Sequence, residues 1–182
     1  KSIKKCIYLS TADVYGIPQK LPITESLPIA PQTYYAAAKF CCESLIRVSA
    51  QKANIPFLIF RYNGVFGPGQ REFGYGANFF IKSILTKGIV RIWGDGEELR
   101  DSLFVRDLAK IISRLSLNKT TGVYNIAKGK SYSFIEMLEM IKKISGKKFK
   151  VLRKKRTSPA FDQVFDITKL KKVLPQFSFT PM

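Results

Sequence analysis

Short apolar runs alternate with longer amphipathic stretches along this chain. The runs at 6–9, 57–60 and 123–126 predict buried β-strands, because each is brief, apolar and bounded by polar or turn-forming residues. Over 32–51, apolar residues recur at a spacing of three to four, which predicts a helix. The same reasoning gives these further elements: helices over 77–87 and 134–145, a loop leading into a helix over 104–117, strands over 89–93 and 148–152, and a short last helix that Asp166 caps and Pro175 ends.

The order of these elements indicates the fold class. Strands that alternate with helices predict an α/β layered fold with parallel strand pairing. The first strand is not followed by a glycine-rich turn, and neither G-x-G-x-x-G nor G-x-x-G-x-x-G occurs in the sequence. We therefore expect that at least one βαβ unit is missing from the front of the fold.

Composition narrows the class of protein. A chain of 182 residues, 46% of them hydrophobic, can form one ordinary core or one and part of a second. No apolar run approaches the length of a transmembrane helix, and the sequence has neither an initiator Met nor a signal peptide. We expect a cytoplasmic piece whose first residue is not its biological beginning.

The formal net charge of +18 suggests an anionic partner, which could be nucleic acid, a membrane surface or a phosphorylated small molecule. The lysines are scattered, with denser patches at 147–155 and 169–172. This scatter favours a solvated lysine-rich surface, and no nucleic-acid recognition motif is present. We therefore expect neither a specific nucleic-acid partner nor a membrane partner.

The sequence contains no histidine, which excludes Ser-His and Cys-His nucleophile pairs and histidine metal sites. The three cysteines lack metal-ligand spacing, so we expect no metal and interpret them as structural thiols. Any general base must then be Tyr, Lys, Asp, Glu or Cys.

The strongest candidate for such chemistry is the pair Tyr35 and Lys39, which share one face of the predicted helix because they are four residues apart. A free tyrosine titrates near pH ~10, and a nearby ammonium favours the phenolate and lowers its pKa. Such a tyrosine can exchange a proton with a sugar hydroxyl or carbonyl. Thr11 follows the first buried strand, at the end where open α/β sheets place ligand groups, and offers a hydroxyl.

Five segments in order carry a resemblance to a known family. They read S-T-x-x-V-Y-G from Ser10, P-x-x-Y-Y-x-x-x-K from Pro31, R-Y-N-x-V-F-G-P-G from Arg61, I-W-G-D-G-x-x-x-R-D from Ile92, and V-Y-N-I from Val123. This set resembles the extended short-chain dehydrogenase/reductase family of NAD-dependent sugar-nucleotide epimerases and dehydratases, over nearly the whole chain.

The resemblance implies the carboxy-terminal half of a Rossmann-type doubly wound parallel sheet plus a smaller α/β substrate-binding domain. Residues 1–66 would be the remaining part of the NAD-binding domain. Residues 67–182 would be mainly substrate-binding, with about 102–127 returning to the Rossmann domain. The implied ligands are NAD and a nucleotide sugar, and the implied assembly of the parent protein is a homodimer.

The resemblance also implies catalytic and cofactor-binding roles. Tyr35 corresponds to the acid/base, and Lys39 to its partner, which in the family also holds the nicotinamide ribose. Thr11 corresponds to the family's Ser/Thr hydroxyl. Tyr62 lies near the position that contacts the nicotinamide side.

Four further residues correspond to substrate-binding positions. Asn63 resembles a substrate-binding asparagine, although it stands one place early relative to R-x-x-N. Asn78 and Arg100 match positions that contact the substrate diphosphate. Arg156 resembles a second phosphate-binding arginine, with Pro159 where the family often has an acidic residue.

Several functions stay open. Epimerisation comes first, because Ala12 replaces the first carboxylate of the dehydratase pattern S-T-D-E-V-Y-G. A 4,6-dehydratase, with Asp13 as an acid, or a keto-sugar reductase is the alternative. A truncated remnant, inactive because it lacks the glycine-rich pyrophosphate turn, is another. A basic nucleic-acid-binding module rests on charge alone.

Overall fold

A three-stranded parallel sheet forms the centre of the computed structural model, which describes residues 3–69 and 76–181. Its strands are β1 (Cys6–Leu9), β2 (Phe57–Tyr62) and β7 (Gly122–Ile126), in the order β1-β2-β7. Leu9 pairs with Phe60, and Tyr62 pairs with Ile126. The predicted α/β fold with parallel pairing is therefore confirmed.

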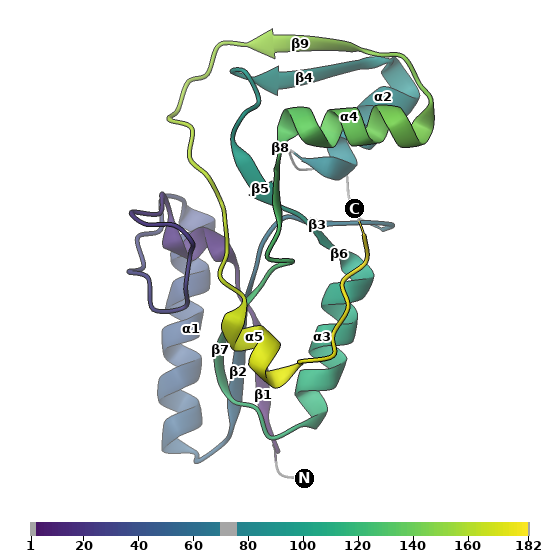
Figure 1. Ribbon diagram of the computed structural model, residues 1–182. Helices are drawn as coiled ribbons and strands as arrows, with labels where there is room; N and C mark the ends of the chain where they lie inside the picture. Colours follow the sequence, from purple (N-terminus) through teal and green to yellow (C-terminus); the bar gives the residue numbers. More distant parts are fainter. Residues whose placement is uncertain (1–2, 70–75, 182) are drawn as a thin grey trace.

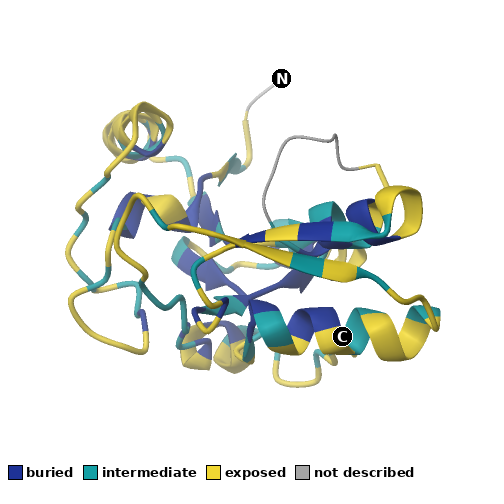
Figure 2. Ribbon diagram, turned by 90° about the horizontal axis from the view of Figure 1, so that it is seen from above, coloured by how far each residue is buried: buried dark blue, intermediate teal, exposed yellow. Residues whose placement is uncertain are grey.

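Helices α1 (Tyr34–Lys52) and α3 (Val105–Leu117) lie on either side of this sheet, as Figure 1 shows. The short helix α5 (Thr168–Val173) packs near β7. Figure 2 shows buried positions gathered in the central strands. The largest buried side chains of this first core include Leu58, Phe60, Ile111, Leu115 and Ile126.

A second layer of strands and helices lies above the sheet (Figure 1). Strands β4 (Ile89–Trp93) and β9 (Lys150–Lys154) pair in parallel, and helices α2 (Ala77–Lys87) and α4 (Phe134–Ser145) pack against them. This second core is built from the following buried side chains: Phe80, Ile84, Val90, Ile92, Phe134, Met137 and Leu138. The assignment of domains to 1–66 and 67–182 remains a prediction.

Short strands that the sequence pattern did not predict connect the two cores. Strand β3 (Val65–Phe66) pairs with β6 (Leu103–Phe104), and β5 (Leu99–Asp101) pairs in antiparallel fashion with β8 (Ser131–Ser133). The 3₁₀ helix η1 (Ala12–Tyr15) follows β1. Strands of two or three residues, and a single 3₁₀ turn, are too short to show a hydrophobic period.

Several predicted boundaries were wrong by one or two residues. The helix expected from 32 begins at 34, because the Thr33 hydroxyl caps it by accepting the Ala36 amide. The strand expected at 148–152 lies at 150–154, where it pairs with β4. The last helix begins at Thr168, and Asp166 accepts the backbone amide of Thr168 from one residue before the N-cap position.

The capping box at the start of α4 gives a stability prediction. Ser133 accepts the Glu136 amide, and the Glu136 carboxylate accepts the Ser133 amide. Ser133→Ala should lower the free energy of unfolding by about 1 kcal/mol, measured by urea denaturation. The exposed mid-helix change Ser113→Ala is the control and should cost less than about 0.5 kcal/mol; equal effects would contradict the capping role.

Among residues 3–69 and 76–181, no helix is both long enough and apolar enough to cross a bilayer.

Candidate functional site

The candidate site begins where β1 ends. Thr11 lies two residues after the end of this strand and caps η1, because its hydroxyl accepts the Asp13 amide at 3.2 Å. Tyr35 lies in the first turn of α1, and the side chains of Thr11 and Tyr62 are close enough to its phenol to shift its pKa. Tyr62 ends β2, so three hydroxyl groups from three elements meet at one edge of the sheet.

Lys39 lies one helical turn after Tyr35, as the spacing predicts. Its Nζ is 5.8 Å from the centroid of the Tyr35 ring and 5.0 Å from that of Tyr8. The amine donates a hydrogen bond of 2.8 Å to the carbonyl oxygen of Leu9. The last residue of β1 therefore fixes this ammonium beside the Tyr35 ring.

The expectation that Lys39 lowers the pKa of Tyr35 is wrong for this structure. The pKa of Tyr35 is raised, first by burial, then by Tyr62 and by the Asp13 carboxylate. The hydrogen bond with Thr11 acts in the opposite direction and lowers this pKa. The physical reason is that the Lys39 amine is directed at the Leu9 carbonyl rather than at the phenol oxygen.

A cleft of about 1220 Å³ opens beside these hydroxyl groups. It runs between the central sheet and the second layer, past the end of β4. Seven of the eight residues singled out from the sequence line it: Thr11, Tyr35, Tyr62, Asn63, Asn78, Arg100 and Arg156. Lys39, the eighth, lies behind Tyr35 against the Leu9 carbonyl.

The two asparagines hold the backbone of the cleft wall. The Asn63 amide donates to the carbonyl of Asp101 at 3.1 Å. Asn78 makes two bonds with Gly67, accepting from its amide at 3.1 Å and donating to its carbonyl at 2.9 Å. Both side chains therefore have structural partners as well as a place on the cleft wall.

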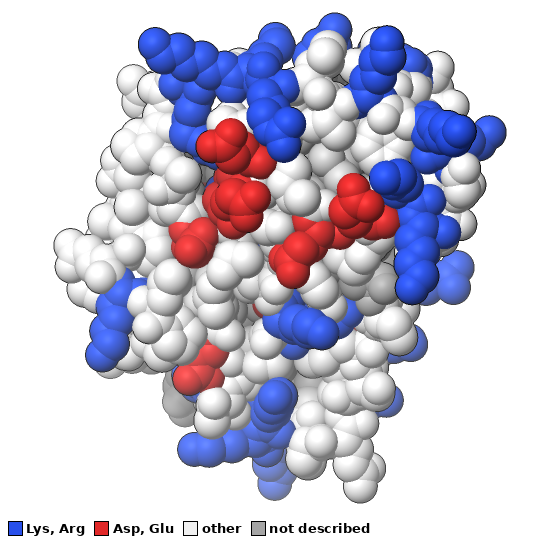
Figure 3. Space-filling view, turned by 45° about the horizontal axis from the view of Figure 1, so that its top comes forward, with Lys and Arg blue, Asp and Glu red and all other residues white. Residues whose placement is uncertain are grey.

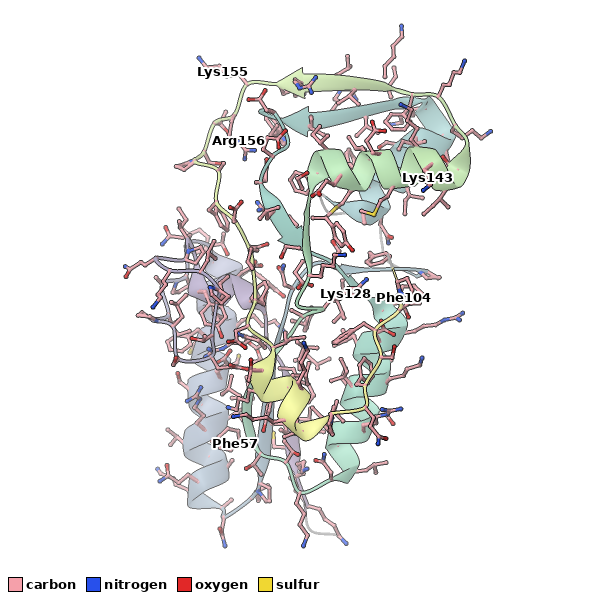
Figure 4. All side chains as sticks on the ribbon, in the orientation of Figure 1. Phe57, Phe104, Lys128, Lys143, Lys155 and Arg156 are labelled. Carbon is pink, nitrogen blue, oxygen red and sulfur yellow. The ribbon has the colours of Figure 1, made fainter. Side chains whose placement is uncertain are left out.

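The two arginines are also held in place. Arg100 Nη1 donates to the carbonyls of Leu99 and Phe161, and its guanidinium lies 5.1 Å from the Phe161 ring centroid. Arg156, on the segment after β9 in Figure 4, donates to the Trp93 carbonyl at 2.9 Å and forms an ion pair with Glu98. The positions of both cationic groups are thus fixed by protein partners.

Sequence reasoning assigned no role to Glu98 or Trp93, although both line the cleft. Glu98 is buried and pairs with Arg156. Trp93 is 39% exposed, and the ammonium of Lys154 lies 5.4 Å from its ring centroid. Both residues lie within the motif from Ile92 to Asp101, which was the sequence signal that could have identified them.

Figure 3 shows acidic groups gathered near the middle of one face, with basic side chains spread around them.

Asp101 is a buried carboxylate that closes the cleft wall. Its oxygens accept the backbone amides of Lys128 at 2.8 Å and Gly129 at 2.7 Å. Burial nevertheless raises its pKa to about 6, and these amides only partly oppose that effect. The folded state therefore binds this proton more tightly than the unfolded chain does.

This raised pKa predicts a pH-dependent stability. The contribution of Asp101 is fully present below pH 3.8 and is lost as the pH rises through about 6. The free energy of unfolding of the wild type, relative to that of Asp101→Asn, should fall by up to about 3 kcal/mol between pH 3.8 and 7. Urea denaturation at successive pH values measures it. The exposed change Asp95→Asn is the control, within about 0.5 kcal/mol throughout, and a flat Asp101 difference would contradict the assignment.

This chain is similar to a known protein family and to curated members of it. A family model described as "NAD dependent epimerase/dehydratase family" matches residues 1–127. UDP-arabinose 4-epimerase 1 of Arabidopsis thaliana is 31% identical, over 94% of this chain and 46% of the relative.

Two solved structures share the fold closely. UDP-N-acetylglucosamine 4-epimerase from Methanobrevibacter ruminantium, in complex with UDP-N-acetylmuramic acid, is 31% identical with a TM-score of 0.90, over 98% of this chain and 58% of that one. UDP-glucuronic acid 4-epimerase from Bacillus cereus, in complex with UDP-glucuronic acid and NAD, is 30% identical with a TM-score of 0.87, over 100% of this chain and 58% of that one.

The chain thus spans about half the length of the curated relative and 58% of the two solved chains. The matched region contains β1, α1 and β2, which carry Thr11, Tyr35, Lys39 and Tyr62. Since the family model covers well over half of its residues, the chain belongs to the NAD-dependent epimerase/dehydratase family.

Proposed function

We propose that this chain provides the acid/base helix and the substrate cleft of an NAD-dependent nucleotide-sugar epimerase that works through a transient keto sugar. The observation that carries the proposal is the meeting of Thr11, Tyr35 and Tyr62 on the wall of a cleft that also holds two arginines. The similar solved proteins that are 4-epimerases support epimerisation as the reaction class.

The residues present fit the nicotinamide end of NAD. Tyr35, Lys39 and Tyr62 bring hydroxyl and ammonium donors to the carboxyl ends of β1 and β2, where open α/β sheets bind such ligands. We propose that these three residues hold that end of the cofactor. The nicotinamide ring held there would supply a reversible hydride acceptor for the sugar carbon.

Tyr35 is proposed to manage the proton that accompanies this chemistry. The pKa of Tyr35 is raised in the chain alone, and the positive charge of the bound cofactor would favour its phenolate. The phenolate takes the proton of the sugar hydroxyl as the carbon is oxidised to the ketone, and the phenol returns the same proton when the ketone is reduced. Thr11, which lines the same cleft, is proposed to hydrogen-bond the sugar oxygen beside Tyr35. Because the keto sugar can present either face on reduction, the configuration of the carbinol carbon inverts without net oxidation.

The nucleotide diphosphate is proposed to bind at the other end of the cleft. The guanidinium groups of Arg100 and Arg156 suit phosphate because they offer fixed, charged donors. The side-chain amide of each asparagine has a second N–H besides the one that bonds the backbone, and Asn63 and Asn78 are proposed to contact the substrate with it.

The test is product analysis with the complete gene product. Incubation with NAD and UDP-glucose, or UDP-galactose, should form the 4-epimer, detected by chromatography and proton NMR. A 4-keto-6-deoxy product would instead establish the second candidate, dehydration. One observation favours that alternative: Asp13 lines the cleft and acts electrostatically on Tyr35.

The remnant alternative is tested separately. Calorimetric titration of NAD into the 182-residue chain should show binding weaker than micromolar, since the sequence lacks the glycine-rich pyrophosphate turn. Binding at micromolar levels would contradict this expectation and would show that the chain alone suffices for the cofactor.

We further propose that the complete protein is a homodimer that pairs through α1. Tyr34, Leu45 and Val48 are exposed apolar side chains on this helix, at 98%, 61% and 53%. Light scattering should give twice the monomer mass, and Leu45→Glu should give the monomer. A monomeric wild type would contradict the proposal.

A further inference from the structure

A buried set of polar side chains lies directly behind the candidate site. The Ser10 hydroxyl donates to Glu43 Oε1 at 2.6 Å. Arg61 donates two hydrogen bonds to the same carboxylate, from Nε to Oε1 at 3.0 Å and from Nη2 to Oε2 at 2.7 Å. All three residues are at most 2% exposed. A two-point ion pair is therefore held in the interior.

The same set continues to the third strand of the sheet. Arg61 Nη1 donates to the Tyr15 hydroxyl at 3.1 Å, and that hydroxyl donates to Asn125 Oδ1 at 2.6 Å. Asn125 Nδ2 donates to the carbonyl of Ile23 at 3.0 Å. We call Ser10, Glu43, Arg61, Tyr15 and Asn125 the buried network. Within residues 3–69 and 76–181, no buried side-chain nitrogen or oxygen lacks a partner.

Two members of the buried network are adjacent in sequence to residues of the site, and a third lies on the same helix as Tyr35 and Lys39. Ser10 precedes Thr11, and Arg61 precedes Tyr62. Glu43 lies one helical turn after Lys39 and two turns after Tyr35 on α1. The buried network thus joins the three elements whose hydroxyl groups meet at the cleft.

Burying a carboxylate and a guanidinium has a large desolvation cost, and apolar residues of similar volume usually stabilise a fold as well or better. An ion pair with two parallel hydrogen bonds instead fixes the distance and the angle between the guanidinium and the carboxylate. We propose that the buried network is a positioning device that sets Thr11, Tyr35 and Tyr62 relative to one another. The inference rests on the proposed function, because epimerisation is the reaction being positioned for.

The main test replaces the central polar groups by apolar ones. The triple variant Ser10→Ala/Glu43→Leu/Arg61→Met removes both charges and the hydroxyl that points at them. If the network positions the site, the variant should melt close to the wild type while kcat falls about 100-fold, the loss that a displacement of about 1 Å can cause. KM should stay within about twofold.

Ser10→Ala is a second, milder variant that leaves the Glu43–Arg61 pair intact. It should fold as the wild type does and lower kcat about tenfold. The reason is that it removes only the hydrogen bond to Glu43 that holds the residue before Thr11. Leu115→Ala, in the first core and away from the cleft, is the control for lost stability. It should lower the melting temperature and leave kcat unchanged below the transition.

A third readout needs no turnover and separates this inference from the proposed function. Carbon-13 NMR of labelled tyrosine in the complete gene product follows the titration of Tyr35, assigned with Tyr35→Phe. In the wild type, Thr11→Val should raise the Tyr35 pKa, because the Thr11 hydrogen bond lowers it. In the Ser10→Ala background the same change should have a much smaller effect.

The outcomes are distinct. Wild-type kcat in both network variants, or an equal Thr11→Val shift in both backgrounds, would overturn the positioning role. If the protein epimerises no nucleotide sugar, the proposed function fails, and the NMR comparison alone decides whether the buried network holds Thr11 against Tyr35.

Discussion

Replacing Tyr35 with phenylalanine should lower the kcat of the complete gene product about 1000-fold. The reason is that the phenyl ring keeps the shape of the first turn of α1 but has no proton to exchange with the sugar hydroxyl. KM should change little, because the arginines at the other end of the cleft are untouched. Since Tyr35 is 50% exposed, the free energy of unfolding should change by less than about 0.5 kcal/mol.

The neighbouring residue offers a matched control. Tyr34 is 98% exposed and is absent from the cleft lining, so Tyr34→Phe should leave kcat at the wild-type value. Initial rates of epimer formation at saturating substrate measure both variants. A Tyr35→Phe protein that retains kcat within tenfold would refute the acid/base role.

Removing one partner of the buried ion pair should have the largest effect on stability. Arg61→Met leaves the Glu43 carboxylate fully buried, with the Ser10 hydroxyl at 2.6 Å and the partly exposed Arg47 at 3.8 Å as its remaining partners among the described residues. The free energy of unfolding should fall by about 3–5 kcal/mol, as measured by urea denaturation. That is a large part of the stability of an ordinary domain, about 5–15 kcal/mol.

The second arginine that pairs with Glu43 provides the control for this experiment. Arg47 also pairs with Glu43, at 3.8 Å, but its side chain is 45% exposed. Arg47→Met should therefore cost less than about 1 kcal/mol. Adding Glu43→Leu to Arg61→Met should recover most of the loss, since no unpaired charge then stays buried. If Arg47→Met and Arg61→Met lowered the free energy of unfolding equally, burial would not determine how much the Glu43–Arg61 pair contributes to stability.

Much of the fold could be predicted from the sequence because its main strands are apolar runs bounded by turn-forming residues and its main helices are long enough to show a period. The short pairs β3–β6 and β5–β8 could not, since two or three residues carry no period and their pairing depends on partners distant in sequence. The same limit explains the displaced strand β9, whose ends are set by its register with β4.

The candidate site was predicted in its members but not in their contacts. Motif order identified seven residues that line one cleft. The bonds of Lys39 to the Leu9 carbonyl and of Asn78 to Gly67 involve backbone atoms, which every residue type possesses, so no sequence pattern reveals them. The Glu43–Arg61 pair had a weak signal: an acid two turns after Tyr35, facing an arginine in an apolar strand.

Trp93 is the one tryptophan in the chain, and its ring stands at the wall of the cleft with the Lys154 ammonium nearby. All indole emission from this chain therefore originates on the wall of the cleft that is proposed to bind the nucleotide sugar. A ligand that fills the cleft should therefore change the fluorescence of this single ring, so that binding can be followed without an attached dye.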